Sequence, residues 1–126
     1  MQSCSVYQTK QFARFARRAR LTDDDLWQAA QRVNDGLIDA DLGGGVIKQR
    51  IARRGEGKSG GSRTILLFRQ DHLAVFVDGF EKKDQANISL GDLRGYQKYA
   101  RFVFGQTMAQ IANDIKGGSL IEVLPP

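Results

Sequence analysis

The stretch that decides the fold spans residues 43–80 and reads GGGVIKQRIARRGEGKSGGSRTILLFRQDHLAVFVDGF. Its alternating and apolar runs predict three strands, over residues 46–53, 63–69 and 73–79. The second and third strands are apolar on both faces, which is typical of central strands that helices cover. A tight turn at 70–71 joins them. We therefore expect a sheet whose central strands lie under helices.

Four helices are predicted around these strands, over 10–19, 22–34, 89–104 and 107–116. The last three each begin at Ser or Thr with Asp or Gln three positions later, the signature of a capping box. A short strand is expected at 3–7, and 39–45 is predicted to be a turn-rich connection. The order β-α-α-β-β-β-α predicts an α+β fold, with an antiparallel sheet packed against N-terminal helices and with C-terminal helices.

The composition predicts one domain, spanning residues 1–126. A single cysteine, Cys4, and the lack of a zinc-ligand set lead us to expect neither a disulfide nor a metal or other cofactor. Without an apolar leader or a membrane-length apolar run, a cytoplasmic location and no membrane partner are expected. The C-terminal SLIEVLPP either completes the sheet or pairs with a partner chain, and completing the sheet is favoured.

Positive charge is concentrated on the first predicted hairpin. Six cations and one acid lie between residues 48 and 63, so this segment carries a formal charge of +5, equal to that of the whole chain. The cations are Lys48, Arg50, Arg53, Arg54, Lys58 and Arg63, and Lys82 and Lys83 follow the third strand. Lys48 and Arg50 project to one face of their strand, and Arg63 could approach Arg50 or Arg53 across the hairpin. Such a cluster favours a polyanionic partner.

Two interpretations of this cluster remain open at the level of residues: a solvated basic hairpin, or a phosphate site. Arginines can stabilise a pentavalent phosphorane through bidentate hydrogen bonds. A lysine crowded by cations has a lowered pKa and could act as acid or base. The only histidine, His72, falls at the predicted turn, where a solvated polar residue is expected. The basic face of the first helix is likewise favoured to be a solvated surface rather than a nucleic-acid contact.

The segments VIKQRIARRGEGKSGGSRTILLFR and AVFVDGFEKKDQANIS resemble the RelE/ParE superfamily of type II toxins, most closely its HigB-like branch. The resemblance implies a toxin that a cognate antitoxin neutralises, usually a helix-turn-helix protein, here HigA-like. It also implies metal-independent cleavage of mRNA on the ribosome, and hence inhibition of translation. By motif, the positions around the scissile phosphate are Lys48, Arg50, Arg63 and Lys83, and the RNA- or phosphate-binding positions are Arg53, Arg54, Lys58 and Lys82.

One position departs from the RelE pattern. Where RelE-like toxins carry a tyrosine near the start of the final helix region, this chain has Ser89, which is equally an N-cap; Tyr96 and Tyr99 lie further along. Members of the superfamily that resemble ParE inhibit DNA gyrase and cut no RNA. Gyrase inhibition and RNA binding without catalysis are therefore the alternative functions.

Overall fold

The computed structural model describes residues 4–52, 61–81 and 87–126. These residues form six strands and four helices. Their order is β1 (Ser5–Thr9), α1 (Lys10–Ala19), α2 (Asp23–Asn34), β2 (Ala40–Gly43), β3 (Val46–Ile51), β4 (Ser62–Arg69), β5 (Leu73–Glu81), α3 (Leu90–Phe104), α4 (Met108–Gly117) and β6 (Leu120–Glu122).

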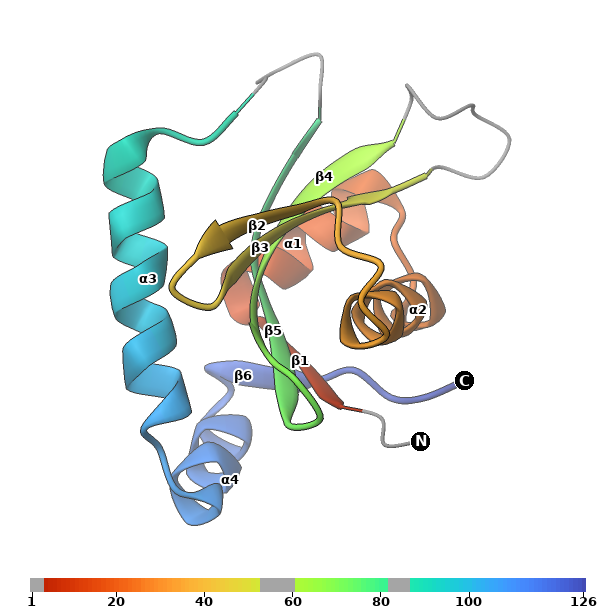
Figure 1. Ribbon diagram of the computed structural model, residues 1–126. Coiled ribbons are helices and arrows are strands. Elements are labelled where there is room, and N and C mark those ends of the chain that lie inside the picture. Colours follow the sequence, from red (N-terminus) through yellow and green to blue (C-terminus); the bar gives the residue numbers. More distant parts are fainter. Residues whose placement is uncertain (1–3, 53–60, 82–86) are drawn as a thin grey trace.

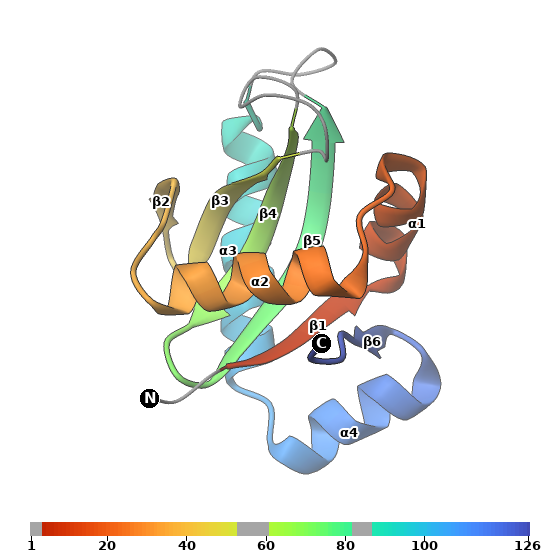
Figure 2. The same cartoon turned by 90° about the vertical axis from the view of Figure 1, so that its right-hand side faces the viewer.

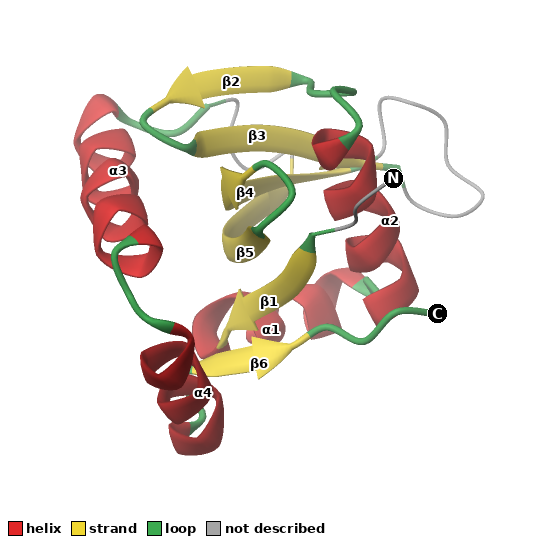
Figure 3. Ribbon diagram, turned by 60° about the horizontal axis from the view of Figure 1, so that its bottom comes forward, coloured by secondary structure: helices red, strands yellow, loops and turns green. Residues whose placement is uncertain are grey.

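The strands form one mixed sheet in the order β2-β3-β4-β5-β1-β6. All neighbours are antiparallel except β1 and β5, which are parallel. The predicted α+β class is confirmed: the sheet is mostly antiparallel, and β1 and β5 are its one parallel pair among the described strands. Strand β1 lies next to the edge strand β6. After β1 the chain runs through α1 and α2 across one face of the sheet and enters the sheet again at the opposite edge as β2 (Figure 3).

Helices cover both faces of the sheet. On one face, α1 and α2 bury an apolar cluster with side chains from β1, β3, β4 and β5, including Phe12, Leu26, Leu66 and Phe76. On the other face, α3 and α4 bury a second cluster that includes Val46, Leu67 and Val103. The result is a three-layer arrangement with the sheet in the middle (Figures 1 and 2).

The predicted helix starts agree with the structure. Thr22 and Asp25 form a complete capping box at α2, and Thr107 and Gln110 form another at α4. Ser89 is the N-cap of α3, and its hydroxyl accepts a hydrogen bond from the Asp92 amide at 3.0 Å. Each cap satisfies backbone donors that the first helical turn leaves unpaired.

The turn-rich connection expected over 39–45 contains a strand, β2, which pairs with β3. The sequence does not predict this strand, because it is short and leads directly into three glycines. Gly43, Gly44 and Gly45 all have positive φ and turn the chain into β3. A Cβ atom at Gly45 would lie 2.6 Å from the ring of Phe104 on α3, so this turn also needs glycine for close packing.

The C-terminal segment completes the sheet, as expected. Strand β6 pairs with β1, with Gln8 opposite Ile121, and it forms one edge of the sheet while β2 forms the other (Figure 3). None of the described helices has the length and apolar character that a membrane-spanning segment needs.

Candidate functional site

Three of the predicted cations lie together on the face of the sheet that α3 covers in part. Arg50 on β3 stands directly opposite Arg63 on β4, and Lys48 stands opposite Ile65. Facing residues in an antiparallel pair project to the same side, so the three side chains share one surface. This arrangement agrees with the predicted strand faces, and all three residues are half-buried.

Hydrogen bonds hold each of these residues at the site. The Lys48 Nζ donates to Oδ1 of Asn87 at 2.9 Å, and the Arg63 Nη1 donates to the carbonyl of Gly61 at 3.1 Å. The backbone amide of Arg50 donates to Oδ2 of Asp39 at 2.7 Å. The acceptors of Lys48 and Arg63 are neutral, so these bonds fix the side chains without neutralising them. A partly fixed cation needs less reorganisation to bind an anion.

The cations line an open pocket of about 250 Å³, together with Asp39. The pocket exists because α3 covers only part of its face of the sheet. The buried residues Ala100 and Val103 of α3 belong to the same apolar cluster as Val46, at the start of β3. Further along β3, the same face carries Lys48 and then Arg50 instead of apolar side chains. Along β3, the cationic surface therefore begins after Val46, next to the buried Ile65 of β4.

The carboxylate of Asp78 and the phenol of Tyr96 lie on the same side of the sheet, and neither was predicted from the sequence to belong to the site. The hydroxyl of Tyr96 on α3 donates a hydrogen bond to Oδ2 of Asp78 on β5. Burial, the hydrogen bond to Asp78 and the negative charge of that residue raise the pKa of Tyr96 above its ordinary value of 10.0. The phenol is therefore protonated at neutral pH and acts as the donor.

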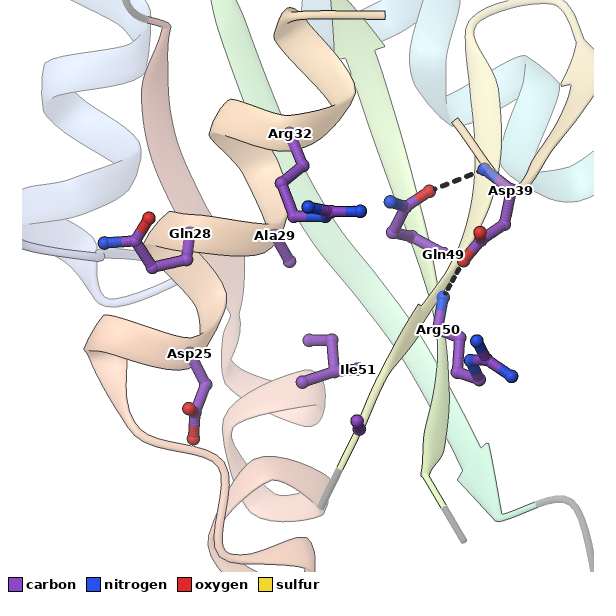
Figure 4. Close-up of a pocket in the computed structure, with 9 residues that line it drawn as sticks. Asp25, Gln28, Ala29, Arg32, Asp39, Gln49, Arg50 and Ile51 are labelled. Atoms are coloured by element: carbon purple, nitrogen blue, oxygen red, sulfur yellow. Dashed lines mark hydrogen bonds between the residues drawn. The ribbon is translucent and has the colours of Figure 1, made fainter. Parts of the chain in front are cut away.

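Strand β3 also has a pocket on its opposite side, between it and α2, with a volume of about 310 Å³ (Figure 4). Here Arg32 extends from α2 toward β3. Asp39 and Arg50 line both pockets, although the Arg50 side chain points to the other side of the strand. Gln49 faces α2. Its Oε1 accepts a hydrogen bond from the Asp39 amide, and its Nε2 donates one to the Leu37 carbonyl, each at 2.9 Å. Asp39 therefore ties the edge of the sheet to both Gln49 and Arg50.

The remaining predicted site residues lie outside the described residues. They are Arg53, Arg54, Lys58, Lys82 and Lys83. Two residues weighed for other chemistry have ordinary positions: His72 is exposed at the β4–β5 turn, and Cys4 is buried, where desolvation raises the pKa of its thiol. A buried thiol of raised pKa is a poor nucleophile.

Comparison with known proteins identifies the family of the chain. A family model described as the RelE toxin of the RelE/RelB toxin–antitoxin system matches residues 4–123. No curated protein matches the chain. The family match spans all ten elements of the fold and implies an antitoxin as a partner. The chain therefore belongs to the RelE family, the toxins of type II toxin–antitoxin systems.

Proposed function

We propose that this toxin is a metal-independent endoribonuclease that cuts mRNA on the ribosome and thereby inhibits translation. The observation that carries the proposal is the direct pairing of Arg50 with Arg63 across β3 and β4. Like charges placed opposite each other destabilise a sheet, unless an anion lies between them. A phosphate group of RNA is an anion that two guanidinium groups can bind in bidentate fashion.

The chemistry of RNA cleavage matches the groups in this pocket. Attack of a ribose 2′-oxygen on the neighbouring phosphorus builds up negative charge on the phosphorane oxygens. Arg50 and Arg63 stabilise that charge in the proposed mechanism, and the ammonium of Lys48 stands beside them. The proposal also gives Lys83 a place at the scissile phosphate and Arg53, Arg54, Lys58 and Lys82 a role in holding the RNA, as the resemblance implies.

The proposal includes the partners of the toxin. The motif of residues 45–89 resembles the HigB-like branch, so the cognate antitoxin is proposed to be a helix-turn-helix protein of the HigA type. The ribosome and its bound mRNA are the proposed target, which places the toxin in the cytoplasm. A positively charged protein associates quickly with such a polyanionic target, at a rate that falls with salt.

Expression of the toxin, with mRNA ends mapped by primer extension, tests this function. We expect Arg63→Ala to lower the cleavage rate on programmed ribosomes about 100-fold, because one preorganised donor to an oxyanion contributes that much. Lys48→Ala is expected to reduce cleavage as well. Arg32→Ala is the matched control, since Arg32 lines the pocket on the α2 side of β3 and does not line the cationic pocket. Cleavage and growth arrest that survive both Arg63→Ala and Lys48→Ala would show that the assigned site is wrong.

Inhibition of DNA gyrase is the second candidate function. It is favoured by Ser89, which occupies the position of the RelE tyrosine and is a helix cap in this fold. A supercoiling assay separates the two functions. Full gyrase activity at saturating toxin, together with mRNA cleavage on ribosomes, supports the nuclease, and the opposite pair of results supports gyrase inhibition.

A further inference from the structure

A bulge in β5 directs Asp78 toward the cationic surface. Along β5, Val75 and Val77 belong to the apolar cluster under α3, and Phe76 belongs to the cluster under α1 and α2. Strict alternation would place Asp78 on the same side as Phe76. The register shifts at this point, however, because Ile65 pairs with Asp78 whereas Leu66 pairs with Phe76. The extra residue turns Asp78 back to the α3 side of the sheet.

Two donors hold the Asp78 carboxylate. Tyr96 donates its hydroxyl to Oδ2, and the backbone amide of Gly79 donates to Oδ1 at 2.8 Å. A carboxylate has about four acceptor positions, so two are left after these bonds. Asp78 is half-buried and keeps one side toward solvent. The carboxylate is thus fixed in orientation, and it can still accept a proton or another hydrogen bond.

The Asp78 carboxylate and the cations lie on one face of the sheet, on either side of the buried Ile65. Ile65 pairs with Lys48 on one side and with Asp78 on the other. With strands about 4.8 Å apart, the Cα atoms of Lys48 and Asp78 are separated by about 10 Å. Arg63 lies two residues from Ile65 on the central strand, so it is the diagonal neighbour of both.

We propose that Asp78 is the general base of this cleavage reaction and that Tyr96 is its positioning residue. The inference rests on the nuclease function proposed above. Asp78 takes the proton of the 2′-hydroxyl as the 2′-oxygen forms its bond to phosphorus. The bond between phosphorus and the 5′-oxygen breaks, its electron pair stays on that oxygen, and the ammonium of Lys48 supplies the proton. The products are a 2′,3′-cyclic phosphate and a 5′-hydroxyl.

Asp39 is the other carboxylate at this pocket, and its position suits a different role. Its Oδ2 accepts the backbone amide of Arg50, and its own amide bonds Gln49, so it fastens the edge of β3. Asp78 instead accepts hydrogen bonds from the Tyr96 hydroxyl and the Gly79 amide. These two donors orient the carboxylate, as general bases in active sites are commonly oriented by a further group. The geometry therefore favours Asp78 as the proton acceptor.

Steady-state cleavage of ribosome-bound mRNA by the full-length toxin tests the assignment. Asp78→Asn preserves shape and the acceptor for Tyr96, and we expect it to lower kcat about 100-fold or more while KM stays within about threefold. Formate is expected to restore part of the activity of Asp78→Ala, because it replaces the missing carboxylate, and to leave Arg63→Ala unchanged. Tyr96→Phe, which keeps the carboxylate itself, should lower kcat about tenfold without raising KM. Glu122→Gln, an exposed change on β6, is the control with unchanged activity.

The outcomes separate this inference from the function on which it rests. A wild-type toxin that cleaves RNA alongside an equally active Asp78→Asn variant overturns the role of Asp78 and leaves the nuclease function intact. A folded Asp78→Ala variant that formate does not rescue also overturns the role of Asp78. The same conclusion follows if Asp39→Asn abolishes cleavage and Asp78→Asn does not. Should Asp78→Asn fail to fold, a Tyr96→Phe variant with a wild-type rate overturns the assignment equally. A wild-type toxin without cleavage products overturns both proposals.

Discussion

The two faces of β3 show how one strand serves two purposes. Toward α1 and α2, Ile47 and Ile51 are 3% and 7% exposed and belong to a continuous apolar cluster. Toward α3, Val46 is buried, but Lys48 and Arg50 are half-buried cations that line an open pocket. On the first face, both ends of the strand belong to the core, and the hydrogen-bonded Gln49 lies between them. On the second face, only one end belongs to the core, and the other end is available for an anionic ligand.

The largest expected effect is the loss of a large core side chain on the α1–α2 face. Phe76 is fully buried, and its ring centroid lies 5.2 Å from that of Phe12. We expect Phe76→Ala to lower the free energy of unfolding by about 3–5 kcal/mol, because it removes apolar contacts and leaves a cavity. Urea denaturation followed by circular dichroism measures this. Phe102→Ala, at a phenylalanine that is 61% exposed, is the matched control and should change stability by less than about 0.5 kcal/mol.

An intermediate effect is expected at Gly79 on β5, which packs against the α1–α2 core and directly follows Asp78. A Cβ atom at Gly79 would lie 2.3 Å from the ring of Phe15, which is itself part of the core. Gly79→Ala should therefore destabilise the protein by about 1–3 kcal/mol through overpacking. Because the Gly79 amide donates a hydrogen bond to the Asp78 carboxylate, cleavage should fall as well, even where the variant is fully folded. Stability and single-turnover cleavage measured on one preparation check both effects, and an unchanged cleavage rate would show that the faces are independent.

The smallest expected effect concerns pH. Burial and Asp78 raise the pKa of Tyr96, so the folded protein holds this proton at a pH where the unfolded chain releases it. The stabilisation is fully present below pH 10, the ordinary pKa of tyrosine, and decreases as the pH rises above that value. Denaturant titrations at several alkaline pH values should show a shallower decline for Tyr96→Phe than for the wild type.

Tyr99 is the comparison for this test. Its pKa is also raised, first by burial and then by the negative charge of Asp114 on α4, instead of by Asp78. Tyr99→Phe is expected to flatten the alkaline decline to a smaller extent and to leave RNA cleavage unchanged. A larger effect of Tyr99→Phe than of Tyr96→Phe on both readouts would contradict the proposed importance of the Tyr96–Asp78 pair.

Much of the architecture could be predicted from local patterns. Capping residues such as Thr22 and Thr107 act within one helical turn, so the helix starts they predict agree with the structure. Alternation placed Lys48 and Arg50 on one side of β3 because that strand is regular. Strand β2 was not predicted, since four residues that end in a glycine turn carry little strand signal of their own.

Asp78 illustrates what such patterns cannot reach. Alternation along β5 assigns it to the face of Phe76, and only the register shift opposite Ile65 and Leu66 reverses that assignment. The partner of Asp78 is Tyr96, 18 positions away on a helix whose docking depends on the whole α3 side of the core. Nothing in the neighbourhood of either residue in the sequence predicts this pair.

The sequence by itself determined the helices, the central strands, the concentration of charge between residues 48 and 63, and the likeness to RelE-type toxins. These features follow from short-range physics, namely the periodicity of apolar residues, helix caps and composition. The tertiary structure alone decided that β1 joins β5 in parallel, that Arg50 meets Arg63, and that Asp78 turns toward Tyr96. Strand register and bulges arise from packing between segments that are distant in the chain, and no local pattern encodes them.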